Sequence, residues 1–404
     1  MLVFYNIGIR LYQLAVFVAS FFNPKAKLWL NGREGLLESI EQQVGNFSGE
    51  TVWVHCSSLG EFEMARPIID GLKESDSKLR IVLTFFSPSG YEIRKNYSLA
   101  DHVFYLPLDT KSNALRFIEA IKPSKTIFVK YDLWFHYLNE AKNAGSKLML
   151  ISAQFRDNQS YFKAYGGVGR QALGLFDQIF LVDADSEKLL QQVGIVNTTV
   201  CGDTRYDRVM EIARLAESTP SIEAFKGTGN LLVCGSTWPE DEKLLTQCIS
   251  QFPDTKWVIA PHEVGEQNMA RLEKLFSNSV RFSTLENSDA KVVIVDSIGL
   301  LSKLYKHATL AYVGGAFRTG LHNILEATAY GVPTVFGPNH SRFPDAGEMV
   351  SNGTAFSIKN QTELEDRLEK LMNADQKELR NSILEFMQAR TGATKAILQY
   401  TKEC

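Results

Sequence analysis

Short apolar runs alternate with longer stretches of helical periodicity along most of this 404-residue chain, and this alternation limits the fold more than any other feature. Continuous apolar runs are typical of strands buried on both faces, and their alternation with helices predicts a parallel, doubly wound α/β sheet. In the first half the runs lie at 51–55, 80–85, 103–106, 126–129, 148–151 and 178–182, with helical stretches near 115–121, 134–144 and 187–193.

The pattern repeats after a polar segment that contains Pro220, Gly227 and Gly229, which predicts a linker over 216–229. A chain of this length also favours two domains. We therefore expect a first domain over 31–215 and a second over 230–385, with a C-terminal helix over 386–404 as a candidate to return to the first. The second set of apolar runs lies at 231–234, 257–260, 292–295, 310–313 and 333–336.

Polar and glycine-containing loops follow several of the predicted strands, and ligands of such sheets bind outside the carboxyl ends of the strands. The fullest example runs from Gly314 to Glu326. Gly314 and Gly315 allow a tight turn, and a helix predicted over 323–330 would leave backbone N–H groups free to meet an anion. Glu326 can accept the hydroxyls of a ribose. The alternative is a βαβ unit with tight turns and no ligand, and this stretch alone leaves both interpretations open.

Glu61 stands in the predicted first turn of a helix, directly after a strand and a glycine turn. A carboxylate there stabilises the helix dipole by about 0.3–1 kcal/mol. As a general base on a hydroxyl it would contribute roughly 10²–10⁴ in rate. The small residues around it and its place at a strand end favour the second role.

Residues 1–22 contain twelve Leu, Ile, Val or Phe residues. Each favours the bilayer by about 0.3–0.6 kcal/mol at best, whereas Arg10 near the centre costs roughly 3 kcal/mol, which predicts a poor spanning helix. Arg10 also interrupts the apolar region that a signal peptide would need. The apolar residues instead gather on one helical face, opposite Asn6, Arg10, Gln13 and Ser20; they are Val3, Ile7, Leu11, Leu14, Val18 and Phe21.

This arrangement predicts an amphipathic helix within residues 1–30 that lies in a membrane interface. Lys25, Lys27 and Arg33 follow it and suit anionic headgroups. The alternative is a helix docked on the protein's own core.

Composition excludes several classes. A net charge of -3 argues against wholesale nucleic-acid binding. The five cysteines are scattered, without metal-ligand spacing, which indicates reduced thiols. Asp183 and Asp185 form a D-x-D pair that can hold a divalent metal, but a helix start capped by Asp185 or Ser186 explains the segment better. We expect no metal and no cofactor.

Several segments, in this order and spacing, carry a resemblance to a known family. The chain resembles the Kdo transferases, which move 3-deoxy-D-manno-octulosonic acid (Kdo) from its CMP donor onto the lipid A precursor. The resemblance implies a GT-B fold of two Rossmann-like domains facing across a cleft, with the acceptor bound by the first, the donor by the second and no metal. The segments are 58–61, 106–109, 202–207, 235–237 and 322–326 after Gly314-Gly315.

The resemblance also assigns residues. Glu61 matches the catalytic base, and Arg205 matches a basic position, usually lysine, that steadies charge on the donor. Leu300 replaces an acid in a CMP-contacting Gly-Glu-Leu, so any contact there must come from the backbone. Positions matched to or predicted for donor binding are Ser236, Thr237, Pro261, His262, Gly299, Leu300, Leu301, Gly315, Asn323, Ile324, Leu325 and Glu326.

Residues 130–132 depart from the family, which often has Glu-Thr-Glu there. A carboxylate survives only at Asp132, and Lys130 reverses a charge. We expect Lys130 and Asp132 to belong to the transition-state or acceptor site, where Lys130 can pair with an acceptor phosphate or the Kdo carboxylate.

Taken together, the residues and the resemblance predict an inverting transferase that moves Kdo from CMP-Kdo to lipid IVA at the cytoplasmic face of the bacterial inner membrane, in lipopolysaccharide biosynthesis. Three alternatives use the same scaffold: a GT-B enzyme with a UDP-sugar donor, a nucleotide-sugar epimerase without a lipid acceptor, and a non-catalytic sugar-nucleotide binding module. The number of Kdo residues added is not encoded in these motifs.

Overall fold

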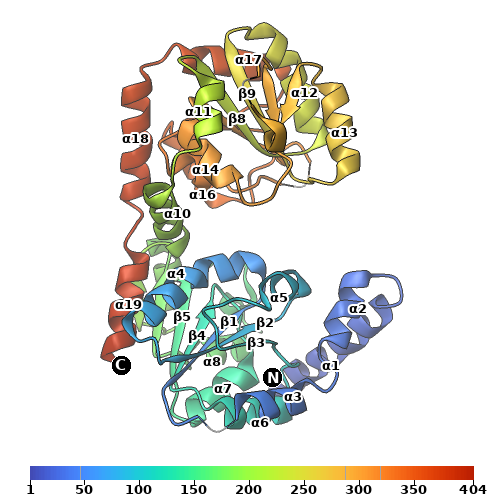
Figure 1. Ribbon diagram of the computed structural model, residues 1–404. Coiled ribbons are helices and arrows are strands. Elements are labelled where there is room, and N and C mark those ends of the chain that lie inside the picture. The colour runs from blue at the N-terminus through green and yellow to red at the C-terminus, as the bar shows by residue number, and fades with distance from the viewer. Residues whose placement is uncertain (46, 287, 319) are drawn as a thin grey trace. The chain divides into compact units, whose positions relative to one another are not determined.

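A computed structural model describes residues 1–45, 47–286, 288–318 and 320–404. Thr319, within the stretch from Gly314 to Glu326, lies outside the described residues. The chain divides into two compact units, which are described separately. Unit 1 comprises Met1–Asp207 with Thr391–Cys404, and unit 2 comprises Arg208–Arg390 (Figure 1). The division thus falls within helix α10, Thr204–Leu215, ahead of the segment 216–229, which itself contains helix α11, Pro220–Lys226.

The described part of unit 1 contains a seven-stranded sheet of order β3-β2-β1-β4-β5-β6-β7, in which every pairing is parallel. The predicted doubly wound α/β fold is therefore confirmed for this half. The last strand in this order, β7, was not predicted, because it has only three residues and is partly polar. The strands are β1 Thr51–Cys56, β2 Arg80–Phe85, β3 His102–Tyr105, β4 Lys125–Val129, β5 Lys147–Ala153, β6 Gln178–Leu181 and β7 Thr198–Val200.

Two apolar clusters cover the two faces of this sheet. Trp53 of β1 lies in one cluster with residues of α3, α6, α7, α8 and α9, and Val52 and Val54 lie in the other with α4 and α19. The helices are α1 Leu2–Ala19, α2 Pro24–Asn31, α3 Leu36–Val44, α4 Leu59–Ser75, α5 Pro88–Arg94, α6 Lys111–Ile121, α7 Phe135–Asn143, α8 Gly167–Leu173, α9 Ala184–Gln192 and α19 Ala393–Glu403.

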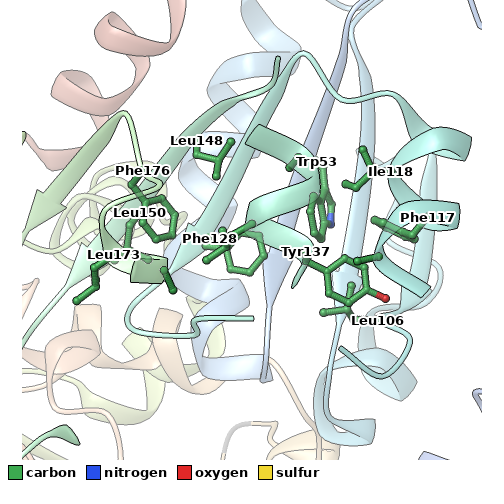
Figure 2. Packing of buried hydrophobic residues seen from close by; sticks show 14 of the residues in the cluster. Trp53, Leu106, Phe117, Ile118, Phe128, Tyr137, Leu148, Leu150, Leu173 and Phe176 are labelled. Carbon is green, nitrogen blue, oxygen red and sulfur yellow. The ribbon is translucent and has the colours of Figure 1, made fainter. Parts of the chain in front are cut away.

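Aromatic packing fixes the centre of this sheet. The ring centroid of Trp53 lies 5.0 Å from that of Phe117, 5.1 Å from that of Phe128 and 5.7 Å from that of Tyr137. Figure 2 shows these side chains gathered around Trp53. Such edge-to-face pairs add to the free energy gained by burial. Because β1 and β4 are held side by side here, the loops at their carboxyl ends keep a fixed separation.

The described part of unit 2 contains a second seven-stranded parallel sheet, of order β10-β11-β9-β8-β12-β13-β14. Its strands are β8 Asn230–Thr237, β9 Thr255–Pro261, β10 Ser279–Arg281, β11 Val292–Ile294, β12 Leu310–Val313, β13 Thr334–Phe336 and β14 Ala355–Ser357. Its helices include α12 Pro239–Gln251, α13 Glu266–Leu275, α14 Leu301–Leu304, α15 Leu325–Thr328, α16 Pro344–Ser351, α17 Gln361–Met372 and α18 Gln376–Gln388.

Two helix boundaries predicted from the sequence are wrong. The helix predicted over 323–330 is only α15, because the Asn323 side chain accepts the backbone N–H of Leu325 and so turns the chain before the helix begins. Gly331, with φ +70°, then ends the segment. Helix α9 is capped by Asp183, which accepts the N–H of Ser186, and not by Asp185 or Ser186.

Helix α1 combines a docked side with an exposed apolar side. Ile9 is buried against Trp29 and Leu108, and Asn6 accepts a hydrogen bond from His136 Nε2 at 2.7 Å. Among the described helices α1 alone is long and apolar enough to cross a membrane by length and composition. All six residues predicted for its apolar face are exposed, by 50–69%: Val3, Ile7, Leu11, Leu14, Val18 and Phe21.

Candidate active site

Glu61 lies in the first turn of α4, beyond the carboxyl end of β1. Ser58 caps this helix through a hydrogen bond from the backbone N–H of Glu61 to its hydroxyl, at 3.4 Å. The backbone N–H of Ser57 in turn donates to the Glu61 carboxylate. The cap therefore holds the carboxyl group of Glu61 at the end of β1, in the first helical turn, where the sequence predicted it.

Burial raises the pKa of Glu61 to about 7, and the negative charge of Asp132 adds to the rise. The Ser57 N–H and the positive charge of Lys130 oppose it. A carboxyl group with a pKa near neutrality is suited to accept a proton from a hydroxyl and to release it again.

Asp132 follows β4, the neighbour of β1 in the sheet, and one of its oxygens accepts three hydrogen bonds. Trp134 Nε1 donates to Asp132 Oδ2 at 3.0 Å, His55 Nε2 at 3.1 Å, and the Ser57 hydroxyl also donates to this oxygen. Within the described part of the chain the second oxygen, Oδ1, accepts none. Asp132 therefore has a fixed orientation and an oxygen that can accept a further hydrogen bond.

The hydrogen bonds behind Asp132 determine the tautomer of His55, which is fully buried. Because the Asp132 carboxylate accepts from Nε2, the neutral ring of His55 leaves Nδ1 as an acceptor for the Thr84 hydroxyl at 2.9 Å, and this hydroxyl also accepts from Trp53 Nε1 at 2.8 Å. His55 Nε2 then carries the proton that it donates to Asp132. His55 and Thr84 were not predicted as site residues. Both lie inside predicted strands, where a single polar side chain forms no recognisable motif with its neighbours in sequence.

Lys130 has a backbone conformation that side-chain-bearing residues rarely adopt, with φ +61°. Ser152 at the end of β5 and Ser236 in β8 share this feature, with φ +49° and +52°. All three lie at the carboxyl ends of parallel strands. Strain of this kind gathers at functional sites, which favours a functional role for these loops.

Arg205 begins α10 and forms an ion pair with Asp203, whose carboxylate is 3% exposed and lies 2.7 Å from Arg205 Nη2. The neighbouring Thr204 hydroxyl donates to the carbonyl of Met64 in α4 at 2.7 Å. Through this bond the start of α10 is attached to the helix that carries Glu61. The structure thus brings Glu61, Asp132 and the start of α10 to one end of the sheet of unit 1.

In unit 2 the glycine turn after β12 closes around a buried carboxylate. Asp241 of α12 is 1% exposed and accepts hydrogen bonds from the Tyr312 hydroxyl at 2.7 Å and from the backbone N–H of Gly315 at 3.0 Å. A Cβ at Gly314 would lie 2.5 Å from the Ser236 carbonyl oxygen, and one at Gly315 would lie 2.4 Å from the Gly320 carbonyl oxygen. Neither position has room for a side chain, which explains both glycines.

Three rings stack beside this turn. The centroid of His262 lies 4.7 Å from those of Trp238 and His322, and Trp238 Nε1 donates to His322 Nε2 at 2.9 Å. Burial, with a smaller effect from His262, lowers the pKa of His322 to about 4, so its ring is neutral near pH 7. The sequence pointed to His262 but missed Trp238 as a site residue, because only the fold brings residues 84 positions apart into contact.

The remaining predicted donor residues occupy neighbouring loops. Asn323 Nδ2, just before α15, donates to Glu326 Oε1 at 3.0 Å, so these two side chains lie side by side. The Thr237 hydroxyl donates to the buried Glu242, and Gly299 has φ +90° before α14. Leu300 is the N-cap residue of α14 and Leu301 is its first residue. Pro261 is the last residue of β9.

Comparison with known proteins finds one family that this chain resembles. A model of the 3-deoxy-D-manno-octulosonic-acid transferase (kdotransferase) family matches residues 30–208. The 3-deoxy-D-manno-octulosonic acid transferase of Aquifex aeolicus is 29% identical over 80% of this chain and 86% of that protein. The transferase of the same name from Chlamydia trachomatis serovar A is 27% identical over 80% and 79%. The chain therefore resembles the Kdo transferases over most of its length.

These similarities show that the protein is a glycosyltransferase. The UDP-GlcNAc 2-epimerase of Neisseria meningitidis, solved bound to UDP-GlcNAc, matches its fold with a TM-score of 0.63, 14% identity and coverage of 88% of this chain and 100% of that chain. MurG of Acinetobacter baumannii matches with a TM-score of 0.59, 11% identity and the same coverage. These likenesses show the fold alone, and they confirm the predicted GT-B architecture.

Within the described residues of this glycosyltransferase, no group of three His, Cys, Asp or Glu side chains is arranged to hold a metal ion. Asp183 is occupied by the cap of α9 and by Gln154 Nε2, which donates to it at 2.9 Å. Asp185 pairs with Lys188. The D-x-D pair is therefore used in local structure.

Proposed function

We propose that the chain transfers Kdo from CMP-Kdo to a sugar hydroxyl of the lipid A precursor, lipid IVA, with inversion at the anomeric carbon. The observation that carries this proposal is Glu61, a half-buried carboxyl group with a pKa of about 7 at the end of β1. The family supports Kdo transfer in lipopolysaccharide biosynthesis. The donor nucleotide, the acceptor and the catalytic base belong to the proposal.

Glu61 acts as the general base. It removes the proton of the acceptor hydroxyl as that oxygen attacks the anomeric carbon of Kdo. The bond between this carbon and the phosphate oxygen of CMP breaks, and its electron pair leaves with CMP. The raised pKa supports this role, because a weakly basic carboxylate would take the proton less readily.

Asp132 orients the acceptor. Its Oδ2 is held by Trp134, Ser57 and His55, and its Oδ1 accepts a second hydroxyl of the acceptor sugar. His55 is a positioning residue in this scheme, since it touches Asp132 and not the substrate. Lys130 stands in place of an acid that is common in the family. Its positive charge lowers the pKa of Glu61, and it suits an anionic group of either substrate.

Arg205 offsets the negative charge that develops on the leaving phosphate. Its ion pair with Asp203 supports this role by limiting the conformations of the guanidinium group. A preorganised cation stabilises charge without reorganisation at the moment of reaction.

The donor residues belong to unit 2. Glu326, bonded to Asn323, accepts the ribose hydroxyls, and the backbone N–H groups near Gly299 and Gly315 meet the phosphate. Ser236, Thr237, Pro261, His262, Leu300, Leu301, Ile324 and Leu325 complete the donor site.

Helix α1 keeps unit 1 at the cytoplasmic face of the inner membrane. Its exposed apolar side supports this, because so many large apolar residues are rarely left in water on one helix. The acceptor would then be reached from the inner leaflet.

The test is an acceptor assay with the full-length protein, tetraacylated lipid A precursor and CMP-Kdo made in situ, followed by mass spectrometry of the lipid. We expect a mass gain of whole Kdo units with the wild type and none with Glu61→Ala. CMP and UMP titrations run alongside distinguish the donors. Normal turnover by Glu61→Ala would contradict the assignment of Glu61 as the base. Tighter binding of UMP than of CMP would contradict CMP-Kdo as the donor and favour a UDP-sugar.

A further inference from the structure

An apolar groove of about 610 Å³ lies in unit 1 between the start of α1 and the segment that leads into α8. We call it the α1–α8 groove. Its walls are mostly apolar and aromatic, as in sites that take an apolar ligand. They include Met1, Phe4, Tyr5, Leu133, Tyr161 and Val168.

One end of the groove adjoins the proposed acceptor residues. Leu133 lies between Asp132 and Trp134, which are hydrogen-bonded to each other. Tyr161, on the opposite wall, has its pKa raised to about 12 by burial and, to a smaller extent, by the charges of Tyr131 and Asp132. The carboxylate that we assign to the acceptor sugar is therefore a neighbour of this apolar surface.

The other side of the groove continues into the exposed face of α1. Met1 is 65% exposed and Phe4 78%, although both line the groove. Val3 and Ile7, on the same helix, are also exposed. An apolar surface that runs from water-exposed helix residues to a polar site is expected where an amphiphile binds.

Glycines in 166–169 make the close packing of this wall possible. A Cβ at Gly167 would lie 2.3 Å from the terminal methyl carbon of Met1, and one at Gly169 would lie 2.7 Å from the ring of Tyr161. A Cβ at Gly166 would collide with the backbone carbonyl of Ser160. The groove is therefore a built feature of this segment.

Cations without ion-pair partners accompany the apolar lining. Lys163 lies between the lining residues Tyr161 and Tyr165, and Arg156 precedes them. In the described part of the chain neither side chain forms a salt bridge. Positive charge beside an apolar groove complements a lipid with an anionic headgroup.

We propose that the α1–α8 groove holds one acyl chain of the anionic glycolipid acceptor, with its sugar at Asp132 and its headgroup charge beside Lys163. This inference rests on the proposed function, and it names the part of the acceptor that the protein itself binds. The other acyl chains stay in the membrane.

The experiment compares two acceptors in the same neutral detergent: the tetraacylated lipid A precursor and its fully deacylated disaccharide bisphosphate. The readout is the ratio of kcat/KM for the acylated over the deacylated acceptor. Val168→Trp fills the groove and should lower this ratio by roughly tenfold, equivalent to withdrawing about two methylene groups from an apolar site. The loss should appear in KM for the acylated acceptor.

Leu115→Trp is the matched control, because Leu115 lines a separate pocket of unit 1, also about 610 Å³ in volume, formed by α6 and α7 residues. It should leave the ratio within twofold of the wild type. An equal effect of the two variants on the ratio would overturn the proposal.

A second measurement does not depend on a folded variant. An acceptor with a photoreactive group at the end of an acyl chain should label residues 160–169 of the wild-type protein. Labelling confined to the outer face of α1 would overturn the proposal, because all chains would then remain in lipid. If the wild type had equal kcat/KM for both acceptors, the groove proposal would be wrong and the proposed function would stand. If it transferred Kdo to neither acceptor, both proposals would be wrong.

Discussion

The carboxyl ends of the two sheets carry carboxylates, buried in unit 2 and half-buried in unit 1, that differ in how many hydrogen bonds they accept. In unit 2, Asp241 accepts hydrogen bonds from Tyr312 and from the N–H groups of Trp238 and Gly315, and Glu242 pairs with Arg271. In unit 1, Glu61 receives one backbone N–H, and Asp132 keeps one oxygen unused by the described residues.

At the carboxyl ends of two similar parallel sheets, the carboxylates of unit 2 hold loops together, whereas Glu61 of unit 1 accepts fewer hydrogen bonds from the described residues than Asp241 does. Burial raises the pKa of Asp241 and of Glu242, but their hydrogen-bond donors and Arg271 oppose the rise. The same hydrogen bonds fix the loops that supply the donors. A half-buried carboxylate with few donors is easily protonated, as the pKa of Glu61 shows. This difference fits the proposal that unit 2 holds a ligand through its loops and that unit 1 exchanges a proton.

The largest expected effect comes from removing that proton exchange. Glu61→Gln keeps the shape and the Ser57 contact but cannot accept a proton, so we expect kcat to fall by about 10²–10⁴. Because the raised pKa means that ionising Glu61 destabilises the fold as pH rises through about 7, the variant should unfold at a higher temperature than the wild type at pH 8.

Turnover and thermal unfolding at pH 8 check this prediction together. A variant that is inactive because it is poorly folded would unfold at a lower temperature and contradict it. Glu63→Gln, two residues further along the same helix, serves as the surface control.

The second prediction concerns the glycine turn of unit 2. Gly315→Ala would place a Cβ against the Gly320 carbonyl at a backbone φ of +93°, and we expect it to lower the free energy of unfolding of unit 2 by about 1–3 kcal/mol. CMP affinity, measured by calorimetry, should fall at least tenfold. Gly347→Ala in α16 has free space and should stabilise the protein slightly. Equal behaviour of the two variants would show that the turn tolerates a side chain.

The contrast between the units also explains what the sequence could predict. The places of Glu61 at a strand end and of Asn323 beside Glu326 could be predicted because they depend on local spacing, within one helix turn or one cap, whereas their roles stay predictions. Both sheets were found because buried parallel strands are continuous apolar runs. His55, Thr84 and Trp238 were missed because their contacts join different strands and loops, and no local pattern encodes such contacts.

The third prediction sharpens the electrostatics of unit 1. Asp132 raises the pKa of Glu61 and Lys130 lowers it, with burial as the larger cause of the net rise. Asp132→Asn should therefore move the acidic limb of the kcat/KM profile to lower pH, and Lys130→Met should move it to higher pH, each by less than about one pH unit. Shifts in the same direction would contradict the assignment of this limb to Glu61.

The smallest expected effect lies in the ring stack of unit 2. Because the pKa of His322 is about 4 in the folded protein and about 6.5 when unfolded, the unfolded chain binds more protons between these values. The stability that His322 contributes is present above pH 6.5 and is lost as pH falls towards 4, by about 1 kcal/mol after allowance for its partial exposure.

His322→Gln should remove this part of the pH dependence, which thermal unfolding of unit 2 between pH 7 and pH 4.5 measures. Trp238→Phe separates the two physical causes. It removes the hydrogen bond to His322 Nε2 but keeps an aromatic ring against the stack. Since burial and not this hydrogen bond is the main cause of the lowered pKa, the pH dependence should persist in Trp238→Phe. Its loss in both variants would mean that the hydrogen bond from Trp238, and not burial, is the main cause of the lowered pKa of His322.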